Sequence, residues 1–114
     1  MTTPADELRT AAQKLLDLAD AAQDDLHTGD YWASYPKESA WHDGLTNGMG
    51  GTSGDLAAVF SPATAHALAA WLRDSAIIHL PDTECGYCDP NRNPLRLPCH
   101  ALAVARAILG GGQP

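Results

Sequence analysis

Residues 79–100 of the chain read HLPDTECGYCDPNRNPLRLPCH, and this stretch contains all three cysteines of the protein. It also contains Pro81, Pro90, Pro94 and Pro98. Because proline breaks helices and disrupts sheet pairing, neither kind of element can run through the stretch. A connection of this length without secondary structure is uncommon in a small domain, so the sequence predicts that something else orders it.

The spacing of the sulfur and imidazole groups here indicates a metal site. Two residues separate Cys85 from Cys88, ten more precede Cys99, and five residues separate His79 from Cys85. Three cysteines and one histidine form a recognised closed zinc set, because thiolates and a neutral imidazole suit this borderline-soft ion. We therefore predict a structural Zn²⁺ in a metal-binding loop over 79–99, bound by His79, Cys85, Cys88 and Cys99.

The fourth ligand has several candidates. His79 gives the spacing His-x5-Cys-x2-Cys-x10-Cys and reaches in from the end of a predicted helix. His100 directly follows Cys99, but neighbouring helical side chains point about 100° apart, which makes a shared metal awkward. A carboxylate from Glu84 or Asp89, or a water molecule, is the remaining alternative.

Other interpretations of the cysteines stay open. Cys-Gly-Tyr-Cys is also typical of thioredoxin-like redox centres, but that chemistry places the pair at the start of a helix, which Pro90 and Pro94 oppose. Ordinary free thiols are a further alternative. A disulfide framework is disfavoured by the odd cysteine count. The segment Met1–Glu7 has no feature of a secretory signal, so we expect a cytoplasmic protein.

Outward from this stretch, three segments have the apolar periodicity of helices. We predict them over 4–26, 61–76 and 99–109. Thr3 and Ser61 are suited to cap the first two, because each precedes a proline that favours the first helical position.

Between the first two predicted helices, the sequence predicts a hairpin and then a loop, and Asp55–Phe60 fits either one helical turn or a short strand. Residues 31–35 are rich in aromatic side chains, and with Trp41 and His42 they predict a small β-hairpin over 31–43. Residues 44–54 contain five glycines and predict a glycine-rich loop. The loop has no lysine and lacks the spacing of a phosphate-binding loop, so we predict no nucleotide cofactor. The expected fold is a single α+β domain over 1–114, mainly helical, with three helices, the hairpin and a zinc-knuckle loop.

Composition and charge limit the function classes. The 114 residues are 45% apolar and 18% charged, which is typical of one globular domain. A net charge of −7 argues against a protein that holds nucleic acid by bulk positive charge. No apolar run is long enough for a membrane span, so we expect no membrane partner. Residues 1–30 contain seven acidic and two basic residues. This acidic segment is either a solvated helix face or a surface that imitates nucleic acid or binds a basic partner.

Three stretches resemble short, mostly uncharacterised accessory proteins of actinobacteria and their phages. Leu8–Leu15 reads LRTAAQKL, Ser61–Leu72 reads SPATAHALAAWL, and Ala101–Leu109 reads ALAVARAIL. The segment Thr28–Trp32 departs from the related Thr-Pro-Gly-Pro-Trp turn, since it has no proline. A similar His/Cys run in small actinobacterial proteins favours His79 as the fourth ligand. The resemblance covers three helical segments, implies a phage or prophage accessory protein, and transfers no catalytic residue.

These observations favour a zinc-stabilised, non-catalytic interaction protein that binds a host protein. Closed cysteine-rich sites are usually structural, and the sequence contains no catalytic constellation, so no catalytic residue is predicted and we lean against an enzyme. The alternatives are an acidic inhibitor that imitates nucleic acid and a small zinc hydrolase or nucleotide-processing enzyme, which needs an open metal position. A small core and a buried last helix are also compatible with a homodimer.

Overall fold

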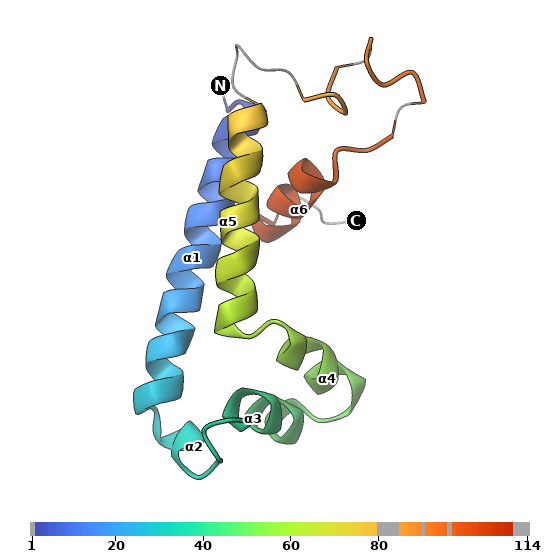
Figure 1. The fold of residues 1–114 in the computed structure, drawn as a ribbon. Coiled ribbons are helices and arrows are strands. Elements are labelled where there is room, and N and C mark those ends of the chain that lie inside the picture. Colours follow the sequence, from blue (N-terminus) through green and yellow to red (C-terminus); the bar gives the residue numbers. More distant parts are fainter. Residues whose placement is uncertain (1, 80–84, 90, 96, 111–114) are drawn as a thin grey trace. The chain divides into compact units, whose positions relative to one another are not determined.

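The computed structural model describes residues 2–79, 85–89, 91–95 and 97–110, which form helices and connecting turns without any strand (Figure 1). In chain order the helices are α1 (Pro4–Thr28), α2 (Asp30–Ala33), α3 (Ala40–Met49), α4 (Gly51–Val59), α5 (Pro62–Ile78) and α6 (His100–Ile108). The protein is therefore helical, as predicted, but the expected α+β class is wrong. No helix in the described part of the chain is long and apolar enough to cross a membrane.

The chain divides into two compact units. Unit 1 consists of Met1–Leu15 and Leu68–Pro114, and unit 2 consists of Leu16–Ala67. Helices α1 and α5 contribute residues to both units, whereas α6 belongs to unit 1 and α2, α3 and α4 belong to unit 2. The two units are therefore described separately below.

Unit 1 has a core of leucine and alanine from α1, α5 and α6. Its buried members are Leu8, Ala11, Ala12, Leu72, Ala76, Leu102 and Ala105. The three helices lie where the sequence predicts helices over 4–26, 61–76 and 99–109. Because alanine contributes little area, and apolar burial stabilises by roughly 25 cal/mol per Å², this core gives a modest stabilisation.

Polar contacts join α6 to α1 at the edge of this core. The Lys14 ammonium donates to the Ile108 carbonyl at 2.9 Å, near the end of α6 where free carbonyl groups favour a cation. The Arg106 guanidinium pairs with the Glu7 carboxylate at 3.1 Å. At the start of α1, the Asp6 N–H donates to the Thr3 hydroxyl at 3.1 Å, which is the predicted cap.

The β-hairpin predicted over 31–43 does not form, because this segment of unit 2 is helical where it is regular. Trp32 lies in the single turn of α2, is buried, and stacks on Trp41 of α3 with ring centroids 5.4 Å apart. The preference of aromatic residues for strands reflects packing on a pleated surface rather than an intrinsic backbone choice. An isolated hairpin is marginal, so packing the rings on a helix is the better solution.

The glycine-rich loop predicted over 44–54 is also wrong, since its glycines lie mainly in α3 and α4. A Cβ atom at Gly44 would lie 2.3 Å from Cζ3 of Trp32, and one at Gly48 would lie 2.6 Å from the Tyr31 hydroxyl. These glycines therefore allow two aromatic rings to lie directly on α3. Gly50 separates the two helices with a φ of +74°, which favours glycine.

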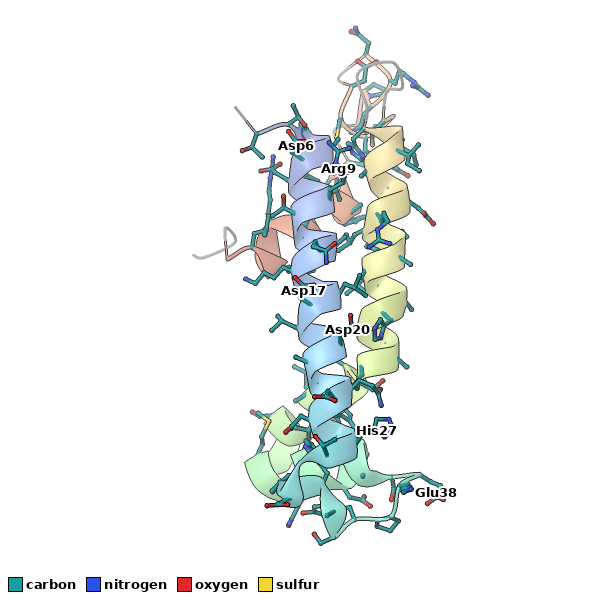
Figure 2. All side chains as sticks on the ribbon, turned by 90° about the vertical axis from the view of Figure 1, so that its left-hand side faces the viewer. Asp6, Arg9, Asp17, Asp20, His27 and Glu38 are labelled. Atoms are coloured by element: carbon teal, nitrogen blue, oxygen red, sulfur yellow. The ribbon has the colours of Figure 1, made fainter. Side chains whose placement is uncertain are left out.

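Hydrogen bonds add specific links within unit 2. The Trp32 indole N–H donates to the Asp25 carboxylate at 2.8 Å. Asp20 lies on α1 (Figure 2). Its carboxylate lies 2.7 Å from Nε2 of His66, and Nδ1 of the same ring lies 2.7 Å from the Pro62 carbonyl. Since both ring nitrogens face acceptors, the protonated imidazole is favoured. Hydrogen bonding to Asp20, together with the Pro62 carbonyl, raises the pKa of His66.

Candidate metal centre

Four side chains from three separate parts of unit 1 converge at one point. His79 directly follows α5, Cys85 and Cys88 lie in the loop, and Cys99 directly precedes α6. One donor atom from each lies within 4.8 Å of every other, so the four side chains are close enough to hold a metal ion. These are the residues that the sequence spacing predicts as ligands.

The distances suit a single tetrahedral ion. The sulfur of Cys99 lies 3.5 Å from Nε2 of His79 and 3.9 Å from the sulfur of Cys85. An ion with ligand bonds of about 2.3 Å to sulfur and about 2.0 Å to nitrogen gives tetrahedral edges of about 3.8 Å between sulfurs and about 3.5 Å between sulfur and nitrogen. These two distances therefore match two edges of such a tetrahedron, and all four donors lie within 4.8 Å of one another.

The imidazole of His79 is oriented by its own helix. Its Nδ1 atom lies 2.7 Å from the carbonyl oxygen of Ser75, four residues earlier. Because a carbonyl only accepts, Nδ1 carries the proton of the neutral ring, and Nε2 presents its lone pair toward Cys99. A carbonyl on the far nitrogen is a typical partner for a metal-binding histidine, since it fixes both tautomer and orientation.

A tight turn positions Cys85 and Cys88. The N–H groups of Cys88 and Asp89 donate to the Cys85 carbonyl at 3.0 and 3.2 Å, and Cys85 is buried. Burial acts to raise the pKa of the Cys85 thiol, but hydrogen bonds from the N–H groups of Tyr87 and Cys88 outweigh it and lower the pKa. These hydrogen bonds therefore favour the thiolate form of Cys85.

The neighbouring sulfurs do not all ionise easily together. Desolvation, and then the adjacent sulfurs of Cys85 and Cys99, raise the pKa of Cys88 to about 12. Three thiolates in this space repel one another unless a cation lies between them. Metal binding at this site would therefore be coupled to proton release from the thiols.

Asn93 holds the loop beyond Cys88, a role that the sequence alone does not indicate. Its side-chain amide donates to the carbonyls of Tyr87 at 3.0 Å and Leu97 at 2.6 Å, while its oxygen accepts from the Leu97 N–H at 3.0 Å. These bonds satisfy backbone groups that no helix or strand pairs here. An asparagine among prolines is a turn signal, but its distant partners do not follow from the sequence.

The other proposed ligands do not join the group. His100 is exposed in the first turn of α6 and is not one of the converging donors. The Asp89 carboxylate accepts from the Asn91 N–H at 3.0 Å, and Glu84 lies outside the described residues. The redox alternative requires its cysteine pair at the start of a helix, whereas Cys85 precedes a turn.

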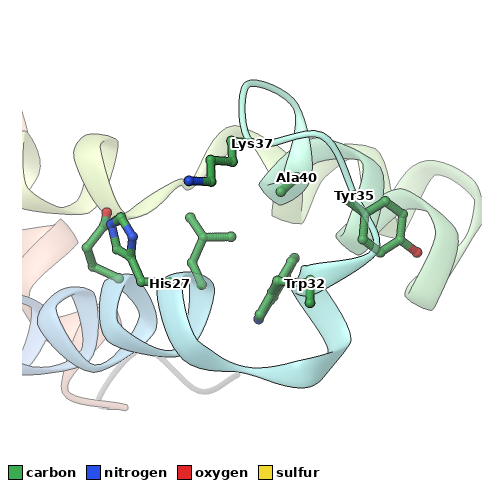
Figure 3. Close-up of a pocket in the computed structure, with 8 residues that line it drawn as sticks. His27, Trp32, Tyr35, Lys37 and Ala40 are labelled. Atoms are coloured by element: carbon green, nitrogen blue, oxygen red, sulfur yellow. The ribbon is translucent and has the colours of Figure 1, made fainter.

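A hollow in unit 2 is a weaker candidate site. It has a volume of about 260 Å³, and Figure 3 shows Trp32, Tyr35 and Ala40 on one side with His27 and Lys37 on another. This volume is below the roughly 300–1,000 Å³ of typical small-molecule pockets. We therefore assign no ligand to it.

No protein-family model matches the chain, and no curated protein or solved structure matches it either.

Proposed function

We propose that the chain is a zinc-stabilised, non-catalytic interaction protein whose single Zn²⁺ is held by His79, Cys85, Cys88 and Cys99. The observation that carries the proposal is the convergence of one imidazole and three sulfurs within 4.8 Å. Three thiolates and an imidazole favour zinc over magnesium or calcium, which prefer oxygen ligands. Tetrahedral geometry disfavours copper(II) and nickel(II), which favour tetragonal sites.

A structural role follows from the number of ligands. Four protein donors fill a tetrahedron, whereas catalytic zinc sites keep one position open for water or substrate. The small zinc hydrolase considered from the sequence therefore has less support. The bound ion would join the end of α5, the cysteine loop and the start of α6, which are otherwise linked by a proline-rich segment. Such a cross-link stabilises the folded chain because the unfolded chain has no preformed site.

An interaction role is supported by apolar side chains that this loop exposes. Tyr87 is 57% exposed, Leu95 is 80% exposed and Leu97 is 50% exposed. Contiguous exposed apolar groups are typical of protein-binding surfaces, and these three side chains line one shallow hollow. The resemblance to phage and actinobacterial accessory proteins supports the same proposal, with a host protein as the partner.

Native mass spectrometry tests the metal centre directly. We expect one zinc per chain in the wild type and in His100→Ala, but a weakened or absent ion in His79→Ala. His79→Cys is the matched control, because a fourth thiolate restores a closed set and zinc retention without the imidazole. Equal zinc content in all four proteins would contradict the assignment of His79, and absence of zinc from the wild type would overturn the proposal.

A further inference from the structure

Helix α4 buries small residues and exposes its larger apolar side chains. Its small residues Gly54 and Ala58 are buried, whereas Leu56 is 65% exposed and Val59 is 62% exposed. Phe60, which ends the helix, is 51% exposed. Residues three and four positions apart share a helix face, so these three apolar side chains form one surface, which we call the α4 patch.

The close packing of α4 on α3 explains this arrangement. A Cβ atom at Gly54 would lie 3.0 Å from the Leu45 carbonyl oxygen and 3.1 Å from the Thr46 Cα atom. The backbones of the two helices therefore approach through small residues. The buried side of α4 uses glycine and alanine, and its larger apolar side chains remain on the opposite side in water. A helix that is apolar on several sides is normally covered by other protein.

The charge of unit 2 indicates what covers the patch. Leu16–Ala67 contains eight acidic residues and one basic residue, Lys37, so it carries the whole net charge of −7. Asp55 lies on α4 itself and precedes Val59 by four residues, on the same face. A second copy would bring a charge of −7 against −7, which disfavours self-association through this surface.

We propose that the α4 patch binds a basic amphipathic helix of a partner protein. Apolar side chains of that helix would cover Leu56, Val59 and Phe60, and its lysine or arginine side chains would face Asp55 and the net negative charge of unit 2. Apolar contact and charge complementarity are both needed, because charge alone speeds encounter more than it adds affinity. The inference rests on the proposed interaction role, but it uses no residue of the metal centre.

Fluorescence anisotropy with a labelled 18-residue helix of leucine and lysine tests this inference on the full zinc-loaded chain. We expect Leu56→Gln/Val59→Gln to weaken binding at least tenfold, although the net charge does not change. Leu18→Gln is the matched control, because Leu18 is an exposed leucine on α1 and is not part of the α4 patch. A helix of leucine and glutamate should not bind, and binding of the lysine helix should weaken as salt rises.

Three results would overturn the inference. Equal peptide binding by the wild type and the double variant would show that binding is electrostatic only. If this binding were then lost on charge reversal at Asp24, the acidic imitation of nucleic acid would be favoured instead. Absence of binding to the lysine helix would show that the α4 patch does not bind a basic helix. Dimerisation that the double variant abolishes would show that a second copy covers the patch instead. Zinc content measured on the same samples separates this result from the proposed function, because the metal centre can fail while peptide binding persists.

Discussion

The two units of this protein reach order in different ways. Unit 1 carries six acidic and six basic residues, and it combines a leucine and alanine core with four converging metal donors. Unit 2 carries the net charge of −7. Its order depends on aromatic rings that lie on glycines of α3, such as Trp32 over Gly44, and on side-chain bonds such as that between His66 and Asp20.

The difference shows two answers to a shortage of large apolar residues. Unit 1 packs alanine-rich helices closely and brings together four side chains that could bind a cross-linking metal ion. In unit 2, the lack of a side chain at Gly44 leaves room for the ring of Trp32 to be buried against α3. A few large rings therefore bury much apolar surface. The stability of unit 1 should therefore depend on metal binding and on its thiols, and the stability of unit 2 on the close packing of its rings against glycine.

Metal removal should have the largest effect and should separate the two units. Zinc at about 1,000 times its Kd stabilises a fold by about 4 kcal/mol, and a chelator removes that term. We expect methyl signals of Leu8 and Leu72 to lose dispersion in NMR spectra, while the indole N–H signal of Trp32 stays in place. Simultaneous loss of both sets of signals would contradict the separation, and retention of both would contradict the role of the metal.

Gly44→Ala should damage unit 2 instead. The new methyl group would meet Trp32 at 2.3 Å, and such overpacking typically costs about 1–3 kcal/mol. Replacing a helical glycine recovers up to about 1 kcal/mol, so we expect a net loss of about 1–2 kcal/mol in urea unfolding. Gly48→Ala is the comparison variant and should lose less, because its methyl group meets the hydroxyl of Tyr31, which donates to the Gly44 carbonyl, rather than the ring of Trp32. Equal losses for both variants would contradict ring packing on Gly44.

The His66 contact should make the stability of unit 2 depend on pH. Its pKa in the folded chain is raised, chiefly by Asp20, above the roughly 6.5 of an unfolded chain. Its stabilisation is therefore complete below the unfolded pKa and is lost as pH rises through the folded pKa. We expect the difference in melting temperature between wild type and His66→Gln to shrink as pH rises from the unfolded pKa through the folded pKa of His66. In NMR titrations, Asp20→Asn should lower the pKa of His66, and an unchanged pKa would contradict the contact.

Arg106→Gln should have the smallest effect. The Arg106–Glu7 pair lies at the edge of unit 1, where Arg106 is largely exposed, and exposed pairs contribute about 0–1 kcal/mol. We expect a loss below about 1 kcal/mol in urea unfolding and no change in zinc content. A loss as large as that of Gly44→Ala would show that this edge contact matters more than its exposure suggests.

The sequence predicted unit 1 better than unit 2, for physical reasons. Helix periodicity at residues such as Leu8 and Leu72 is local, and the spacing of Cys85, Cys88 and Cys99 restricts the chemistry strongly. In contrast, the aromatic run at 31–35 and the glycines of 44–54 each favour non-helical structure when taken alone. The packing of Trp32 on Gly44 favours helical structure in α2 and α3, and it joins residues twelve positions apart.

X-ray absorption at the zinc edge tests the central claim most directly, because it reports the atoms bound to the ion. We predict three sulfur ligands at about 2.3 Å and one nitrogen ligand at about 2.0 Å in the wild type. His79→Cys should convert this set to four sulfurs, and His100→Ala should leave it unchanged. An oxygen ligand at the fourth position, or fewer than three sulfurs, would contradict the closed centre and would support an open, water-bearing site instead.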